Sequence, residues 1–396
     1  MRMRMLSPGR AALVTAVLLA AVNVSAKNKP DEELIKAAKK GDSGKVSQWL
    51  SQGANINAQD GDQRTPLIHA VRGGKLEAVR TLLDAKADIN IQDEDGNTAL
   101  MEAAKRDEPQ PALDLISAGA KLDVRDKDGW TALMEAAKHG TLAVARELIR
   151  KNAELDVRTS DGRSALSLAA ERGTTALVDE LIEAKCDVRN PEFGGYALLV
   201  AAKNDRVDVV IRLMKARAPL GYSNWDGETP LHAAASRGQE RVVAALLQAG
   251  VKPDLTDKQG RTPLILAAAS GHEDVVEALL VGGAEPDHID GNNWTALMYA
   301  AAHSSYGAAG SIKRLVRAGA DVDRRAGYGG KTALMIAAEK GNEQTVDALL
   351  RAQARRDLKS NNRTALDFAL LGGHEKCAEK LGYVKKENRP DRAGKN

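Results

Sequence analysis

The side chains that could perform chemistry are scattered along the 396 residues rather than gathered into motifs. No pair of the seven histidines has the H-x-x-x-H spacing with an acidic partner that zinc enzymes use. The sequence contains no G-x-S-x-G elbow, phosphate-binding loop or Cys–His dyad pattern. We therefore predict that the chain is not an enzyme, and that it holds no catalytic residue, metal or cofactor. The histidines are His69, His139, His232, His272, His288, His303 and His374.

Aspartates recur in short segments that could suggest calcium binding. These segments lack the closing glutamate of a calcium loop. Asp side chains also accept backbone N–H groups in tight turns, so we interpret the segments as turns. The aspartates concerned are Asp60, Asp62, Asp93, Asp95, Asp126, Asp128 and Asp161.

The elements that position these residues come from one motif, typified by TALMEAA at 131–137, which recurs ten times. Its leucine falls at 67, 100, 133, 166, 198, 231, 264, 297, 334 and 366, and six of the nine intervals are 33 residues. Ten copies in phase cannot arise from composition. The chain is therefore built from stacked repeats rather than from separate globular cores.

Residues 126–158 illustrate the expected structure of one repeat. Asp126 begins a turn in which Gly129 supplies a positive φ. Thr131 caps a short helix, Gly140 ends it, and a second helix follows. One such helix pair cannot bury its apolar face alone, so neighbouring repeats must stack.

The pattern resembles the ankyrin-repeat family throughout residues 31–383, most closely at 226–234 (DGETPLHAA) and 260–264 (GRTPL). The resemblance implies an all-α repeat solenoid of about eleven units, each with a β-hairpin or turn followed by two antiparallel helices. It also implies a concave groove that binds a partner, and a His232 that bonds neighbouring backbone.

We divide the chain into a signal peptide at 1–26, a solenoid at 27–383 and a disordered polar tail at 384–396. The solenoid comprises an N-terminal cap at 31–59, nine full repeats at 60–358 and a shortened C-terminal cap at 359–383. Lys376, Glu379 and Lys380 are expected to give the C-terminal cap a polar outer side.

Three repeats depart from the pattern. The third replaces its helix-ending Gly with Asp107 and adds Pro109 and Pro111, which can be tolerated near a helix start. The ninth gains four residues within 304–310, which we predict to form a flexible surface loop. The sixth replaces the capping Thr with Tyr196 and carries Pro191, Phe193 and two glycines, so it is expected to have the least regular hairpin.

The N-terminus has the organisation of a secretory signal. Arg2, Arg4 and Arg10 form a basic region, an apolar stretch follows at 11–24, and cleavage is expected near Ala26. The apolar stretch is short for a membrane-spanning helix, although retention as an uncleaved anchor is the alternative. Cleavage removes three Arg and no acid, which brings the formal net charge from +3 to zero. We therefore expect a periplasmic or secreted protein, without membrane insertion and without nucleic-acid binding.

Cys186 and Cys377 lie in the fifth and eleventh repeats. Six stacked layers would separate them by about 50 Å, whereas a disulfide needs Cα atoms within about 7 Å. We expect two buried thiols and no intramolecular disulfide.

The aromatic residues suggest a binding surface, because six of the twelve fall at hairpin tips. Exposed Trp and Tyr commonly anchor interfaces, although each ring could instead pack on an adjacent hairpin. The six are Trp130, Phe193, Tyr196, Trp225, Trp294 and Tyr328.

Basic residues at the ends of the first helices in repeats two to seven suggest a groove for an acidic partner. The alternative is that these cations only favour the helix dipole. They are Arg72, Lys105, Arg106, Lys138, Arg172, Lys203 and Arg237.

Together these features predict a monomeric, non-catalytic protein that binds a protein partner in the periplasm, where it sequesters, inhibits, protects or scaffolds that partner. A secreted effector that binds a host protein is the second hypothesis. An enzyme or small-ligand binder is the third, and it would require a convergent polar pocket. Fold alone does not decide among them.

Overall fold

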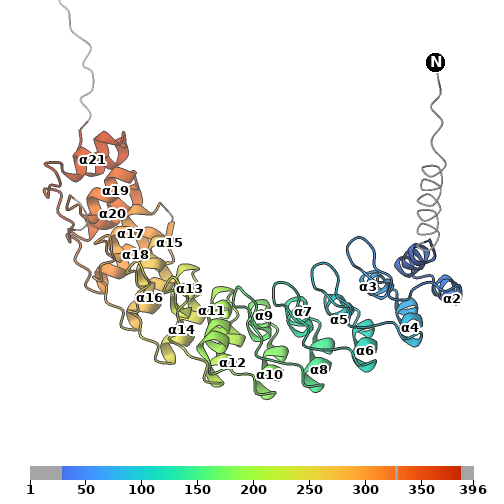
Figure 1. Ribbon diagram of the computed structural model, residues 1–396. Helices are drawn as coiled ribbons and strands as arrows, with labels where there is room; N and C mark the ends of the chain where they lie inside the picture. Colours follow the sequence, from blue (N-terminus) through green and yellow to red (C-terminus); the bar gives the residue numbers. More distant parts are fainter. Residues whose placement is uncertain (1–28, 305, 326–328, 385–396) are drawn as a thin grey trace, which may run out of the picture. The chain divides into compact units, whose positions relative to one another are not determined.

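The computed structural model describes residues 29–304, 306–325 and 329–384. The chain divides into two compact parts, Met1–Asp187 and Val188–Asn396, and each is a stack of paired helices (Figure 1). The described residues contain helices and turns and no sheet, apart from an isolated antiparallel bridge between Ser360 and Arg363. The expected all-α repeat solenoid is thus confirmed. The predicted signal peptide, Tyr328 and, apart from Val384, the predicted polar tail lie outside the described residues.

The N-terminal part begins with a helix over residues 29–40. The helices that follow are α2 (Ser43–Ser51), α3 (Pro66–Arg72), α4 (Leu76–Asp84), α5 (Ala99–Ala104), α6 (Gln110–Ser117), α7 (Ala132–His139), α8 (Leu142–Arg150), α9 (Ala165–Arg172) and α10 (Thr175–Glu183).

The C-terminal part begins with a π-helical turn, η1 (Pro191–Gly195). It continues with α11 (Tyr196–Lys203), α12 (Val207–Lys215), α13 (Pro230–Ser236), α14 (Glu240–Gln248), α15 (Pro263–Ser270), α16 (Glu273–Val281), α17 (Ala296–Ala302), α18 (Tyr306–Arg317), α19 (Ala333–Lys340), α20 (Glu343–Arg351), α21 (Ala365–Leu371) and α22 (Glu375–Lys380).

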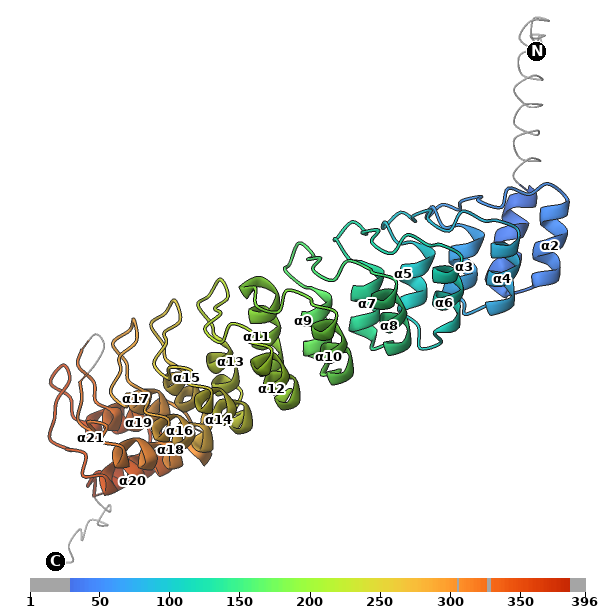
Figure 2. The ribbon, with the colours of Figure 1, turned by 90° about the horizontal axis from the view of Figure 1, so that it is seen from below.

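Within each part the helices pack in two adjoining rows. In the N-terminal part the first helices α3, α5, α7 and α9 pack on one another, and the second helices α4, α6, α8 and α10 form the other row (Figure 1). Small side chains permit this close approach, since Ala136 and Ala137 of α7 are completely buried. The connecting loops reach out from one end of the helix pairs (Figure 2).

Local side chains set the helix boundaries. Thr131 accepts the backbone N–H of Met134, and Gly140 ends α7 at a φ of +79°, both as predicted. Such a cap stabilises a helix by about 1 kcal/mol. The same cap recurs at Thr65, Thr98, Ser164, Thr229, Thr262, Thr295, Thr332 and Thr364.

Seven repeats of the described chain also carry a finger, which we define as the four-residue turn at the tip of the long loop. In every finger the N–H of the fourth residue donates to the carbonyl of the first. The side chain of Asp126 accepts the N–H groups of Asp128 and Trp130 at 2.9 and 2.8 Å, which confirms its predicted role in the turn. The fingers are 60–63, 93–96, 126–129, 159–162, 224–227, 257–260 and 290–293.

The sixth repeat has no finger, so the predicted hairpin there was wrong. The turn η1 runs directly into α11, and Asn190 caps it by accepting the N–H of Glu192 at 2.9 Å. Glycine permits this path, because a Cβ on Gly194 would collide with the carbonyl oxygen of Val188. The segment therefore extends the helix backwards instead of forming a turn.

The insertion in the ninth repeat was predicted to be a flexible loop, and this was wrong for the described residues. It lengthens α18 to 12 residues, against nine in α16 and α20. A Cβ on Gly307 would collide with the carbonyl oxygen of Gly271. The glycines of α18 thus let an added helical turn pack directly on its neighbour.

The N-terminal and C-terminal caps differ in character. The N-terminal cap buries Leu34 and Val46 completely, in keeping with its helical spacing. In the C-terminal cap, Lys380 donates to Asp347 of α20 at 2.6 Å, but Leu371 is 64% exposed. The expected polar outer side is therefore interrupted by leucine.

Both cysteines are buried free thiols, as predicted. Burial raises the pKa of Cys186 to about 12. A thiol with so high a pKa is a poor nucleophile at neutral pH.

Candidate partner-binding surface

A ladder of alternating charges crosses the first helices α3, α5 and α7. Arg72 Nη1 lies 3.4 Å from Glu102 Oε2, and Lys105 Nζ donates to Glu102 Oε1 at 2.7 Å. Lys105 Nζ also lies 3.6 Å from Glu135 Oε1, and His139 Nε2 lies 3.6 Å from Glu135 Oε2. Because both glutamate side chains are more than nine-tenths buried, they hold these cations against the helix surface.

The two glutamates of the ladder have different environments. Burial raises the pKa of Glu135 despite the opposing charges of Lys105 and Lys138, and Glu135 Oε2 accepts no hydrogen bond within the described residues. Burial opposes ionisation of Lys105, but the hydrogen bond to Glu102 and the charges of both glutamates outweigh it and raise the pKa of Lys105. Burial, together with Lys138 and Lys105, lowers the pKa of His139. The ladder is thus well paired at Glu102 and poorly paired at Glu135.

Three other predicted basic residues make contacts within the stack. Arg106 Nη1 donates to the carbonyl of Arg72 at 2.8 Å, and Arg172 Nη1 donates to the carbonyl of Lys138 at 3.2 Å. Each guanidinium thereby caps the first helix of the preceding repeat, whose last carbonyls lack helical partners. Lys138 Nζ lies 4.7 Å from the ring centroid of Trp130. These cations join adjacent repeats or cover an aromatic ring.

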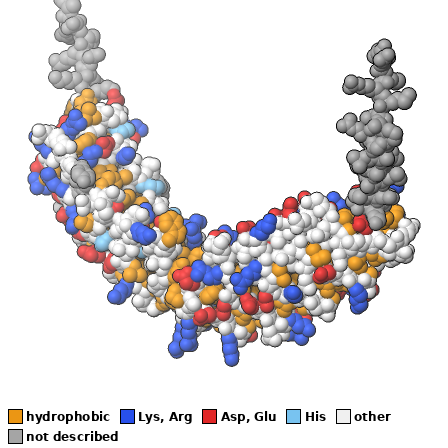
Figure 3. All heavy atoms as spheres, viewed as in Figure 1, with side chains coloured by type: hydrophobic (Ala, Val, Ile, Leu, Met, Phe, Trp, Pro, Cys, Tyr) orange, Lys and Arg blue, Asp and Glu red, His pale blue; other side chains and the backbone are white. Residues whose placement is uncertain are grey.

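Lys203 and Arg237 belong to the C-terminal part. The carbonyl of Lys203 accepts the side-chain N–H of Gln239 at 3.0 Å, and Arg237 is exposed. Acidic and basic side chains are interspersed on the visible face of the molecule (Figure 3). The positions predicted to form a basic groove are therefore largely compensated or occupied within the N-terminal part.

Most of the aromatic residues predicted to lie at tips are partly covered. Trp130 lies under Lys138, and the ring of Trp294 packs 5.1 Å from that of Tyr299. Phe193 lies in η1 rather than in a finger, and Tyr196 begins α11. The prediction that these two residues lie at a hairpin tip was wrong, because η1 continues directly into α11 without a turn between them.

Trp225 is the exception, because 79% of its surface is exposed. It is the second residue of finger 224–227, where the N–H of Gly227 donates to the carbonyl of Asn224 at 2.9 Å. Asn224 Oδ1 also accepts the N–H groups of Asp226 and Glu228, each at 3.0 Å. A hydrogen-bonded turn therefore presents a bare indole, which is the kind of side chain that anchors protein interfaces.

A second exposed feature, which the sequence analysis missed, is the segment over residues 351–363, made of the last residue of α20 and the loop that follows; we call it the 351–363 loop. It carries five cations and one acid, and all five cations are exposed. Arg355 pairs with Asp357 at 2.7 Å, whereas Arg351, Arg356, Lys359 and Arg363 make no ion pair among the described residues. A count of charge along successive loops would have found this segment.

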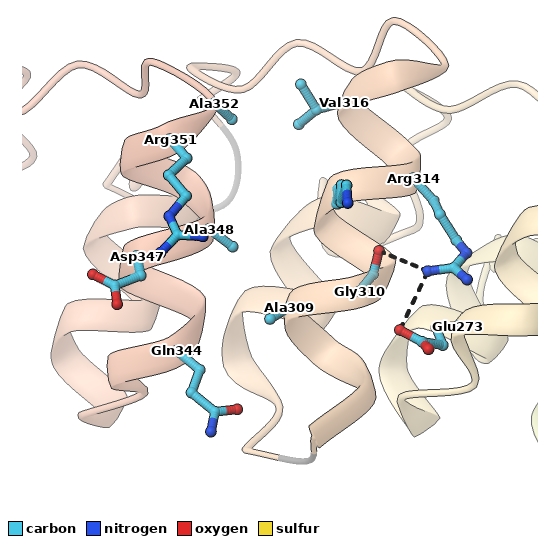
Figure 4. Close-up of a pocket in the computed structure, with 11 residues that line it drawn as sticks. Glu273, Ala309, Gly310, Arg314, Val316, Gln344, Asp347, Ala348, Arg351 and Ala352 are labelled. Carbon is cyan, nitrogen blue, oxygen red and sulfur yellow. Dashed lines mark hydrogen bonds and ion pairs between the residues drawn. The ribbon is translucent and has the colours of Figure 1, made fainter.

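A hollow of about 780 Å³ lies on the second helices of the C-terminal part, between α18 and α20. Ala309, Gly310, Ala348 and Ala352 leave the space, and side chains of both signs border it (Figure 4). Arg314 at its edge is engaged by Glu273, Asp274 and Glu277 at 2.7–3.4 Å. The hollow is thus an open, mixed-charge depression in which one of the three lining cations, Arg314, is already compensated.

A family model for ankyrin repeats in three copies matches residues 34–126, 110–190, 166–257, 243–326 and 304–391. These matches span nearly the whole described chain. The chain belongs to the ankyrin-repeat family. A search of curated proteins found no significant match.

Membership of the ankyrin-repeat family accounts for several side chains. His232 Nε2 lies 3.0 Å from the carbonyl oxygen of Arg261, so it bonds neighbouring backbone as the resemblance implied. His272 and His374 make similar contacts to the carbonyls of Ser236 and Glu339. Ankyrin repeats generally mediate protein–protein interaction.

Among the described residues, no group of three or more His, Cys, Asp or Glu could hold a metal ion. Likewise, no helix in the described ranges is long and apolar enough to cross a membrane.

Proposed function

We propose that this ankyrin-repeat chain is a non-catalytic binding protein that engages a protein partner in the periplasm, or outside the cell, after removal of residues 1–26. The observation that carries the proposal is Trp225, an indole 79% exposed on a hydrogen-bonded finger. Aromatic anchors of this kind contribute most of the affinity in many protein interfaces. The basic region before the short apolar stretch, and the cleavage site expected near Ala26, support export. Sequestration, inhibition, protection and scaffolding are all compatible with such a surface.

Binding can be tested with the purified chain immobilised and exposed to extracts of the cell envelope and of the cytosol. We expect saturable retention of a specific envelope protein, which free chain competes away. Retention of cytosolic proteins alone, or none that is saturable, would refute the proposal. Mass spectrometry of the chain recovered from cells should place its N-terminus at residue 27, whereas an intact Met1 would contradict cleavage.

We further propose that the partner presents an acidic surface to the loop at 351–363. Four cations of this loop have no acidic partner in the described chain, and arginine binds carboxylates through paired N–H donors. Charge reversal of Arg356, Lys359 and Arg363 together should weaken binding and flatten its salt dependence. Reversal of Lys121, Lys151 and Lys185, three exposed loop lysines of the N-terminal part, is the matched control. Equal effects of the two triple variants would remove the loop from the binding surface.

A further inference from the structure

The fingers are joined by one repeated hydrogen bond. The backbone N–H of the second residue in a finger donates to the carbonyl of the third residue in the preceding finger. Glu94 donates in this way to Asp62 at 2.9 Å, and Lys258 donates to Asp226 at 2.9 Å. The same bond links Lys127 to Asp95, Ser160 to Asp128 and Gly291 to Gln259, at 3.1, 3.4 and 2.8 Å.

The missing finger of the sixth repeat breaks this series. Trp225 is the second residue of the first finger in the C-terminal part, and its backbone N–H makes no hydrogen bond among the described residues. η1 takes the place of the finger that would supply the carbonyl. Trp225 therefore offers an open main-chain donor and an exposed indole at the same residue.

The other five junctions show what fits such an edge, because each is filled by the carbonyl of a turn. We propose that Trp225 marks a docking site for an extended or turn segment of a partner protein that takes the place of the missing finger. A main-chain carbonyl of that segment accepts the N–H of Trp225, and a proline or aliphatic side chain covers the indole. Addition of backbone to an open edge is an established mode of peptide recognition. This inference rests on the proposed protein-binding function and specifies where and how the partner is held.

Two variants separate the indole from the N–H. W225A removes the indole only. W225P removes both, while position 225 is the second residue of its turn, where proline is favoured. Since the N–H of Trp225 bonds to no other described residue, W225P should leave the thermal unfolding midpoint close to that of W225A. K258P removes an N–H that donates to the carbonyl of Asp226, so it should lower the midpoint. This variant shows that the assay detects the loss of one hydrogen bond between fingers.

The control for binding is G61P. Gly61 is the second residue of the first finger in the N-terminal part, and its N–H likewise makes no hydrogen bond among the described residues. This edge has no exposed aromatic side chain of its own. G61P should therefore leave partner affinity unchanged.

The probe is a random library of 12-residue peptides displayed on phage and selected on the purified chain. The enriched peptides should bind W225A about 30-fold more weakly, and W225P about 5-fold more weakly again. Equal affinity for W225A and W225P would remove the main-chain bond, and failure to enrich any peptide sensitive to Trp225 would overturn the site. Trp225-dependent self-association in sedimentation would assign the edge to a second copy and also overturn it. An envelope partner that binds W225P as well as the unchanged chain would refute this inference and leave the proposed function intact.

Discussion

Glu102 and Glu135 occupy equivalent positions in successive repeats, yet replacement by glutamine should lower the stability of the fold only at Glu102. Glu102 accepts a hydrogen bond from Lys105 at 2.7 Å and faces Arg72 at 3.4 Å. A charged hydrogen bond contributes about 1.5–3 kcal/mol. The side chains of Lys105 and Arg72 are 29% and 41% exposed, so solvent screening reduces the expected loss in E102Q to about 1–2 kcal/mol.

E135Q should not lower stability at neutral pH. Burial raises the pKa of Glu135, so the folded chain binds a proton at this group more readily than the unfolded chain. The stability that this proton uptake contributes is fully present below the unfolded-state pKa of about 4.3, and it is lost as the pH rises through the pKa of the folded state. At pH 7.5 the neutral amide of glutamine removes the free-energy cost of burying a charged carboxylate. We therefore expect E135Q to match or exceed the stability of the unchanged chain, with a difference that shrinks as the pH falls toward 4.

The assay is equilibrium unfolding in urea, followed by tryptophan fluorescence in a W225F/W294F background. Repeat arrays can unfold in stages, and this background leaves only Trp49 and Trp130, both in the N-terminal part. A double-mutant cycle of E102Q with Lys105→Met isolates the pair. Equal losses for E102Q and E135Q at pH 7.5 would refute the different environments assigned to the two carboxylates.

Three further changes have defined outcomes. G307A should lower the thermal midpoint, because its methyl group would collide with the Gly271 carbonyl, whereas G221A adds a methyl group in open space and should change stability by less than about 0.5 kcal/mol; equal shifts would contradict the packing of α18. The Cys186 thiol should resist labelling by dithiobis(nitrobenzoate) at pH 8 until denaturant is added, since burial raises its pKa to about 12. Prompt labelling of this thiol in the native chain would contradict its burial. Burial also lowers the pKa of His232, so stability should fall as the pH drops below about 6.5, and His232→Asn should reduce that slope between pH 7 and 5 in denaturant titrations.

The regular repeats could be predicted from sequence because each of their features has a local cause. Thr131 caps, Gly140 ends a helix and Asp126 holds a turn within a few residues of its own position. The conformations of the sixth and ninth repeats could not be predicted, since they depend on contacts between segments that are far apart in the repeat pattern. Gly307 is read as loop-forming in isolation, but in the fold it permits contact with Gly271 across a helix interface.

The candidate site was only partly accessible from sequence for the same reason. Position alone placed Arg106 and Arg172 beside a groove, whereas their guanidinium groups reach across to backbone carbonyls of the preceding repeat. Trp225 could be singled out as an aromatic in a turn. Its N–H is unbonded among the described residues because the sixth repeat has no finger. The glycine pair of that repeat is equally compatible with a turn, so the missing finger could not be predicted from sequence.

Photo-crosslinking in cells tests most directly whether the exported chain binds a protein partner through the finger at 224–227, which carries Trp225. A benzoylphenylalanine residue is placed at Ser223, an exposed position two residues before Trp225 that leaves the indole in place, and in a control at Val281, which is 84% exposed at the end of α16. We predict a discrete light-dependent adduct with one exported protein from position 223 and none from position 281. No adduct at position 223, equal adducts at both positions, or adducts with cytosolic proteins alone would contradict the claim.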